Sequence, residues 1–209
     1  MSKKISSGLA VILPNRKINL FVLFLFVLGI ISGSIFLMTL NESDKNLVVT
    51  QITDFINSID GNKINNFKAL KNALYENGIF VILMWVFGMS IIGIIINIFF
   101  TYIKGFIVGF SISSFFLVYK YKGFVLSLIY VFPTLIINII VTIIISVYSI
   151  LFTIYLWKVI FGSDHNIKIK SFFKKYLLIL FICIGLILIS SVTEGYLIPA
   201  LLKLVIKLF

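Results

Sequence analysis

Residues 123–157 read GFVLSLIYVFPTLIINIIVTIIISVYSILFTIYLW, a run without a single charged side chain. Uninterrupted apolar runs of about 18 residues or more are typical of transmembrane helices. As one helix this run would be roughly 52 Å long, which exceeds the hydrocarbon core of about 30 Å. Because Pro133 lacks an amide hydrogen, we expect it to kink or break the helix and to leave a span from Pro133 to Trp157.

Four more charge-free runs flank this one, at 18–40, 77–103, 105–119 and 176–193. Of the 209 residues, 61% are hydrophobic and only 12% are charged, which is too few to cover a soluble domain of this size. The sequence therefore predicts an all-α integral membrane protein, a bundle of about five transmembrane helices. As a helix, the run 105–119 is shorter than the bilayer core is thick. We therefore expect either that it is buried among other helices or that its flanking lysines extend to the headgroups.

The distribution of charge predicts the topology. Residues 1–17 and 158–175 are rich in basic side chains, so the positive-inside rule places both in the cytoplasm. Residues 41–76 carry acids and lysines in near balance, as expected of a segment outside the cytoplasm. An odd number of crossings must then separate 41–76 from 158–175. Three crossings fit, which puts the N-terminus inside and the C-terminus outside.

This topology divides the chain into a cytoplasmic tail (1–17), a first transmembrane helix (18–40), an extracytoplasmic loop (41–76) and a membrane domain with about four further spans (77–209). Two alternatives stay open. The first span could be a cleavable signal peptide, because small residues occur near Gly33. Residues 105–132 could instead form a re-entrant hairpin, which would move the lysine-rich connection to the exterior.

The loop 41–76 contains two apolar stripes at helical spacing, separated by a turn at Gly61. We expect two short amphipathic helices on the outer membrane surface or on the bundle. Their apolar faces would pack on the protein's own spans or offer a docking surface to an extracellular partner. The stripes consist of Val48, Ile52, Phe55, Ile56 and Ile59 in the first half of the loop, and of Ile64, Phe67, Leu70 and Leu74 in the second.

Small residues recur at four-residue spacing in two of the spans. Gly29 and Gly33 form one GxxxG pair, and Gly105 and Gly109 form another that Ser113 extends. Such faces let helix backbones approach closely in lipid. They predict helix packing within the chain, or alternatively an interface with a partner or with a second copy. Two further glycines, Gly88 and Gly93, are candidates for the same role.

Three polar residues in or near the spans are candidates for function. A polar group in lipid needs a partner or a wet cavity, so we expect Asn97 and Asn138 to hydrogen-bond across helices. Glu194 lies at the outer end of the last span. It could sit at the interface, lock the last helix to a neighbour or move a proton, although the sequence offers it no basic partner inside the membrane.

The sequence offers no catalytic or cofactor motif. There is one histidine, His165, in the basic connection, and one cysteine, Cys183, within an apolar run. Neither a metal-binding cluster nor a hydrolase, metalloprotease or nucleotide-binding pattern occurs, so we expect no enzymatic activity, no metal and no cofactor. The net charge of +11 is explained by cytoplasmic lysines and anionic lipid rather than by nucleic acid.

Four stretches of the sequence resemble one known family in order and spacing. They are MWVFGMSIIG at 84–93, KGFIVGF at 104–110, YVFP at 130–133 and EGYLIPALL at 194–202. Together with one N-terminal span and an outer loop of similar length, they resemble the stage II sporulation protein M family over essentially the whole chain. One departure is the Thr134-Leu135 dipeptide, where the family has a polar pair after the proline.

The resemblance implies a role in engulfment during endospore formation, as the membrane anchor of a complex with the peptidoglycan-degrading stage II sporulation proteins D and P. It predicts a non-enzymatic scaffold in the cell membrane, with the lipid bilayer and these two proteins as partners and a homo-oligomer as a further option. The alternative is a transporter or channel for a small solute or lipid, with a midplane site near Pro133, Asn97 and Asn138.

Overall fold

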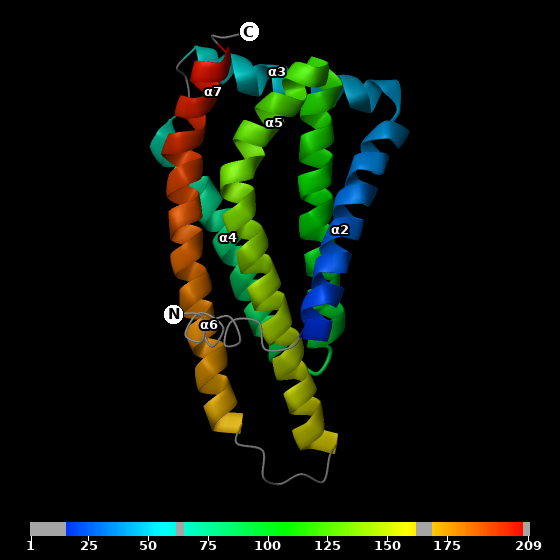
Figure 1. The fold of residues 1–209 in the computed structure, drawn as a ribbon, viewed down its shortest axis with the longest axis vertical. Coiled ribbons are helices and arrows are strands. Elements are labelled where there is room, and N and C mark those ends of the chain that lie inside the picture. The colour runs from blue at the N-terminus through cyan, green and yellow to red at the C-terminus, as the bar shows by residue number, and fades with distance from the viewer. Residues whose placement is uncertain (1–15, 62–64, 162–168, 207–209) are drawn as a thin grey trace, which may run out of the picture.

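The computed structural model describes residues 16–61, 65–161 and 169–206, and this part of the chain is helical with short turns (Figure 1). The helices are α2 (Arg16–Thr39), α3 (Glu42–Asp60), α4 (Asn66–Gly88), α5 (Gly93–Phe161), α6 (Ile169–Val192), the π-helix η1 (Thr193–Leu197) and α7 (Ile198–Ile206). Among the described residues there is no strand. The all-α fold class predicted from the sequence is confirmed.

The long helical segments run side by side along the long axis, and α3 lies across one end (Figure 1). They are α2, α4, the two halves of α5 and α6 with its continuation. Four helices in the described part are long and apolar enough to cross a membrane: Arg16–Thr39, Gly93–Lys122, Ile136–Phe161 and Lys170–Leu204. The chain is therefore a multi-pass membrane protein. The first half of α4 carries Lys68, Lys71 and Glu76, and α4 does not belong to these four, so the count of five stays a prediction.

The boundaries of the middle helices differ from the prediction. Residues 77–103 do not form one span, because α4 ends at Gly88 and α5 begins at Gly93 after a tight turn. Residues 66–74 do not form a separate surface helix either, and Ile64 of the predicted second stripe lies outside the described residues. Asn65 caps α4 by accepting a hydrogen bond from the Lys68 amide at 3.0 Å, and the helix then continues without interruption through Asn77 into the apolar run.

The chain reverses within α5 at Lys120, in the connection predicted between the runs 105–119 and 123–157, whereas the helix break predicted at Pro133 does not occur. Lys120 has φ 51° and ψ −126°, and it is the one residue in α5 with non-helical backbone angles. The backbone is helical through Pro133. Membrane helices tolerate a proline when neighbouring groups bind the carbonyl that the proline leaves without an amide partner. Residues 105–132 are also not a separate re-entrant hairpin, because residues 105–120 complete a helix that begins at Gly93.

The main core lies where α4, the second half of α5 and α6 meet. Its centre is the fully buried Tyr176, whose ring stacks between Trp85 at 5.4 Å and Phe152 at 4.7 Å. Large apolar side chains also cover the outside of the bundle, where Phe24 is 59% exposed and Phe181 is 66% exposed. In water that exterior would be unfavourable, whereas lipid tails solvate it.

The described charges are distributed unequally between the two ends of the bundle (Figure 1). The end opposite α3 carries basic side chains at the start of α2, at the end of α5 and at the start of α6, whereas the α3 end mixes both signs. The basic residues at that opposite end are Arg16, Lys17, Lys158, Lys170, Lys174 and Lys175.

Candidate functional site: a polar seam and an end platform

Hydroxyl groups of α5 and α6 bind the carbonyl groups at the end of α4. Ser149 Oγ donates to the Met84 carbonyl at 3.0 Å, Thr153 Oγ1 donates to the Gly88 carbonyl at 2.8 Å, and the Tyr176 hydroxyl donates to the Trp85 carbonyl at 2.8 Å. The last four carbonyls of a helix lack intrahelical partners, and inside a membrane no water replaces these partners. In α4 they belong to residues 85–88. Tyr176 and Thr153 bind those of Trp85 and Gly88, and backbone amides of the following turn bind the other two, which allows α4 to end within the bundle.

Gly88 and Gly93 make room for these hydroxyl groups. A methyl group at Gly88 would overlap the Tyr176 hydroxyl and the Ser149 side chain, and one at Gly93 would overlap the Thr153 hydroxyl. Both predicted packing glycines thus lie at a helix junction within the chain.

The hydroxyl groups continue along the second half of α5. The polar seam, as we call it, consists of Asn138, Thr142, Ser146, Ser149 and Thr153. Ser146 Oγ lies 2.8 Å from Thr101 Oγ1 on the first half of α5, and Ser190 of α6 donates to Asn138 Oδ1 at 3.0 Å. Only Asn138 of these five residues was predicted from the sequence, although their spacing of three and four residues places all of them on one helix face.

The two predicted intramembrane asparagines behave differently. Asn138 makes the expected bond across helices, to Ser190. Asn97 does not, because its Nδ2 donates to the Gly93 carbonyl of its own helix at 2.8 Å. Asn97 is fully buried, and its Oδ1 accepts no hydrogen bond from any described residue.

Glu194 has a basic neighbour inside the bundle that the sequence analysis did not assign. Lys104 lies in the middle of the candidate span Gly93–Lys122 rather than at the end of one. Its Nζ donates to Asn77 Oδ1 at 2.8 Å and lies 4.9 Å from the centre of the Phe80 ring. The ammonium group interacts electrostatically with Glu194, and more weakly with Glu76. The carboxylates thus offset part of the cost of a cation at this depth.

Glu194 is carried by the π-helix η1, a rare conformation that often marks functional sites. Gly195 allows η1 to pack against α4, since a methyl group there would press on Leu70 and on the Asn66 carbonyl. A pocket of about 230 Å³ opens beside Glu194 and Glu76 at the α3 end.

The two GxxxG pairs pack against each other. Methyl groups at Gly29 and Gly33 would overlap the backbone of the first half of α5, and methyl groups at Gly105 and Gly109 would overlap carbonyl groups of α2. In the structure these four residues make contact within one chain. Ser113 lies beyond them, in a groove between the same two helices.

The helix α3 forms a platform across one end of the bundle. Phe55 packs on Phe115 of α5 with ring centres 6.4 Å apart, and Ile56 and Ile59 are buried in a cluster with Ile198 of α7. The predicted first amphipathic stripe therefore packs on the protein's own helices. The opposite face is polar and exposed, and it consists of Glu42, Asn46, Thr50, Asp54 and Asn57.

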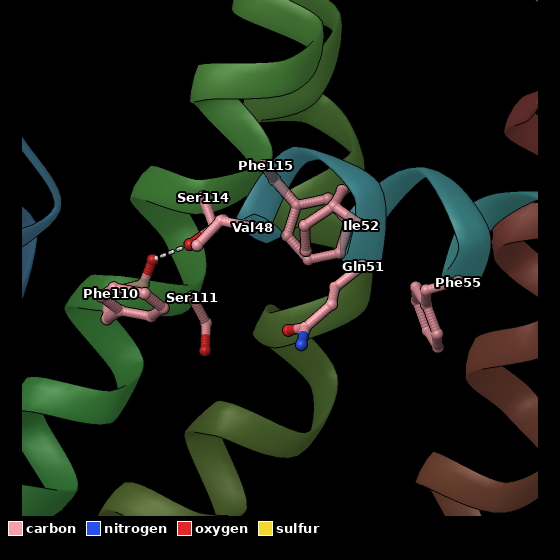
Figure 2. A pocket seen from close by; sticks show the side chains of 8 residues that line it. All are labelled: Val48, Gln51, Ile52, Phe55, Phe110, Ser111, Ser114 and Phe115. Carbon is pink, nitrogen blue, oxygen red and sulfur yellow. Dashed lines mark hydrogen bonds between the residues drawn. The ribbon is translucent and has the colours of Figure 1, made fainter. Parts of the chain in front are cut away.

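A small pocket of about 180 Å³ lies beneath the platform, between α3 and α5 (Figure 2). Gln51 extends into it from α3, and Ser111 and Ser114 border it from α5. Ser114 Oγ donates to the Phe110 carbonyl at 2.8 Å, and Ser111 Oγ binds the Ile107 carbonyl at the same distance. Both hydroxyls are thus engaged by their own helix.

The chemistry of these sites is that of hydrogen bonding and packing. In the described part of the chain, no group of three histidine, cysteine, aspartate or glutamate side chains is placed to hold a metal ion. Cys183, the one cysteine of the chain, is buried in the main core.

Comparison with known proteins gives one match. A family model described as stage II sporulation protein M matches residues 22–199. No curated protein and no solved structure matches the chain.

Proposed function

Because this chain belongs to the stage II sporulation protein M family and is thus a sporulation-related membrane protein, we propose that it is a non-enzymatic scaffold for engulfment. In this proposal the bundle anchors a complex in the cell membrane, and the partners are the peptidoglycan-degrading stage II sporulation proteins D and P. The scaffold brings no chemistry of its own. The partners cut the wall at the place where the bundle holds them.

The proposal includes a topology of five crossings, with α4 as the fifth. The basic residues at the end opposite α3 support a cytoplasmic position for that end. The platform α3 then faces the wall, the N-terminus is cytoplasmic and the C-terminus is extracytoplasmic. Glu76 belongs to α4, and its attraction to Lys104 offsets part of the cost of bringing a charged residue into the bundle. This attraction supports α4 as a crossing.

The observation that carries the proposal is the bracing of α3. An amphipathic helix that only covered the membrane would need no fixed contact with the bundle. Here Ile56 and Ile59 are buried against α5 and α7, and the exposed polar face is thereby held at a fixed angle. A rigid polar face outside the membrane suits the recruitment of a soluble wall enzyme, because less conformational entropy is lost on binding.

The test is co-purification from sporulating cells. The triple variant Asn46→Glu, Thr50→Glu and Asn57→Glu changes only exposed side chains of α3 and adds acids, which the positive-inside rule tolerates on either side. We expect it to insert normally and to lose most of the captured proteins D and P. The matched control, Lys170→Gln with Lys174→Gln, alters exposed residues at the other end and should capture them fully. Undiminished capture by the α3 variant would contradict the docking role of this face.

A second candidate function, transport of a small solute, is favoured by one observation. Lys104 and Glu194 lie within candidate spans and Asn77 of α4 binds Lys104, so polar groups gather inside the bundle, and a pocket adjoins Glu194. Purified protein in vesicles would then move a solute, and Glu194→Gln would stop the flux. An absence of flux over a broad panel of solutes would remove this candidate and leave the scaffold.

A further inference from the structure

A groove opens at the α3 end, between the end of α2 and the end of the first half of α5. Its volume is about 470 Å³. The lining is mostly apolar, with two lysines from different helices. The lining residues are Leu37, Met38, Lys45, Ile112, Ser113, Phe116, Leu117 and Lys120.

Lys45 is fixed at this groove by the end of α2. Its Nζ donates to the Met38 carbonyl at 3.0 Å. That carbonyl belongs to the last turn of α2, where helix carbonyls lack intrahelical partners and carry partial negative charge. Because an ammonium group has three donors, this bond positions the cation and leaves donors for a ligand.

Lys120 reaches the same groove from the reversal of α5. Its φ of 51° is the one positive φ among the described non-glycine residues. Glycine adopts this conformation at lower cost, so the turn alone does not explain a lysine there. The Lys120 side chain instead gives the groove a second cation opposite α2.

We propose that this groove binds an anionic phospholipid, with an acyl chain along the apolar lining and the phosphate between Lys45 and Lys120. Met38 is 73% exposed and Phe116 is 48% exposed, so the lining is open to a lipid chain from the bilayer side. The two cations at the headgroup end complement a phosphate without a neutralising amine. A zwitterionic lipid would bring its own cation toward the same lysines and bind more weakly. This inference goes beyond the scaffold function and does not depend on any partner.

The experiment measures lipid selectivity of the full-length protein in detergent. Bound lipid is quantified by native mass spectrometry while phosphatidylglycerol or phosphatidylcholine is titrated. We expect the wild-type protein to retain phosphatidylglycerol preferentially. Lys45→Gln and Lys120→Gln should each reduce this preference about fivefold, the effect of one lysine near an anionic lipid. The matched control, Lys68→Gln with Lys71→Gln, removes exposed lysines of α4 outside the groove and should preserve the preference.

A second variant tests the apolar part of the groove. Ser113→Trp fills the space between the two helices, and we expect it to displace the bound phosphatidylglycerol. The unfolding temperature of the lipid-free Ser113→Trp protein should stay within the range of the lysine variants. Equal retention of both lipids by the wild type would overturn the proposal. So would an equal loss of selectivity in the α4 control, because that would indicate a diffuse surface charge rather than a site.

Discussion

Gly109 of α5 lies so close to Ile30 of α2 that a single methyl group at this glycine would overlap the Ile30 carbonyl. Ser34 reinforces the contact by donating to the Gly109 carbonyl at 3.2 Å. Without a hydrophobic driving force between helices in lipid, such backbone contacts are what hold α2 to the bundle. The close approach of α2 to the first half of α5 therefore depends on the four glycines of the two GxxxG pairs.

The first prediction concerns this contact. Gly109→Ala should lower the free energy of unfolding in detergent by about 1–3 kcal/mol, because the added methyl group overpacks a rigid interface. Gly185→Ala is the matched control, since a methyl group there meets open space. The control should be neutral or slightly stabilising, because alanine is the better helix former. Equal effects of the two substitutions, followed by thermal unfolding, would contradict the intrachain role of the glycine pairs.

The second prediction concerns the end of α4. Tyr176→Phe removes the donor that binds the Trp85 carbonyl and leaves the stacked ring in place. We expect a loss of about 1–3 kcal/mol, the usual cost of a buried group left without its partner. Tyr155→Phe alters a partly exposed tyrosine that stacks on Phe172, and should change the unfolding temperature little.

The third prediction concerns the charges inside the bundle. Lys104→Met should destabilise the protein because it leaves Glu194 without its cation, and Glu194→Gln should destabilise it for the converse reason. The double variant should lose less than the sum of the two, with a coupling energy of about 0.5–3 kcal/mol, the range seen for residues in one network. A double-mutant cycle of unfolding in detergent measures this coupling. Strict additivity would show that the two groups do not interact.

The fourth prediction separates the two asparagines. Asn138→Leu removes the acceptor of Ser190 and should destabilise the bundle by about 1 kcal/mol. Asn97→Leu removes a buried oxygen that has no partner in the described part of the chain, so it should be neutral or stabilising. If Asn97→Leu preserves stability but abolishes sporulation, the Asn97 oxygen has a functional partner. A large loss of stability for Asn97→Leu would contradict the placement of this side chain.

The sequence predicted the all-helical membrane-spanning class and the family resemblance, because charge-free runs and short motifs are local signals. It placed the reversal of α5 in the connection after residue 119, where Lys120 and Lys122 interrupt the apolar runs, but it also predicted a kink or break at Pro133, where the helix continues. The sequence also led to the prediction that Lys104 lies at the edge of a span, because this lysine interrupts an apolar run. Asn77 lies 27 positions before Lys104 in the chain, and Glu194 lies far after it. Only the tertiary structure brings these two residues near Lys104.

The packing residues were found more easily than their partners. The GxxxG spacing identified Gly29, Gly33, Gly105 and Gly109, but two such pairs on different spans fit contact within a chain and contact between chains equally well. The seam hydroxyls on α5 were hidden because serine and threonine are common in membrane helices. These hydroxyls bind carbonyl groups near the end of α4. That end, at Gly88, lies inside a run without charges, so the sequence did not indicate where α4 ends.

The proposed topology places the braced platform α3 outside the cell and the lysine-rich end of the bundle in the cytoplasm. Cysteine labelling in intact cells tests it most directly, with Asn46→Cys and Lys174→Cys made separately in a Cys183→Ala background. A membrane-impermeant maleimide should label the Asn46→Cys protein at once, and the Lys174→Cys protein only after the cells are permeabilised. Labelling of the Lys174→Cys protein in intact cells, with protection of the Asn46→Cys protein, would contradict the account.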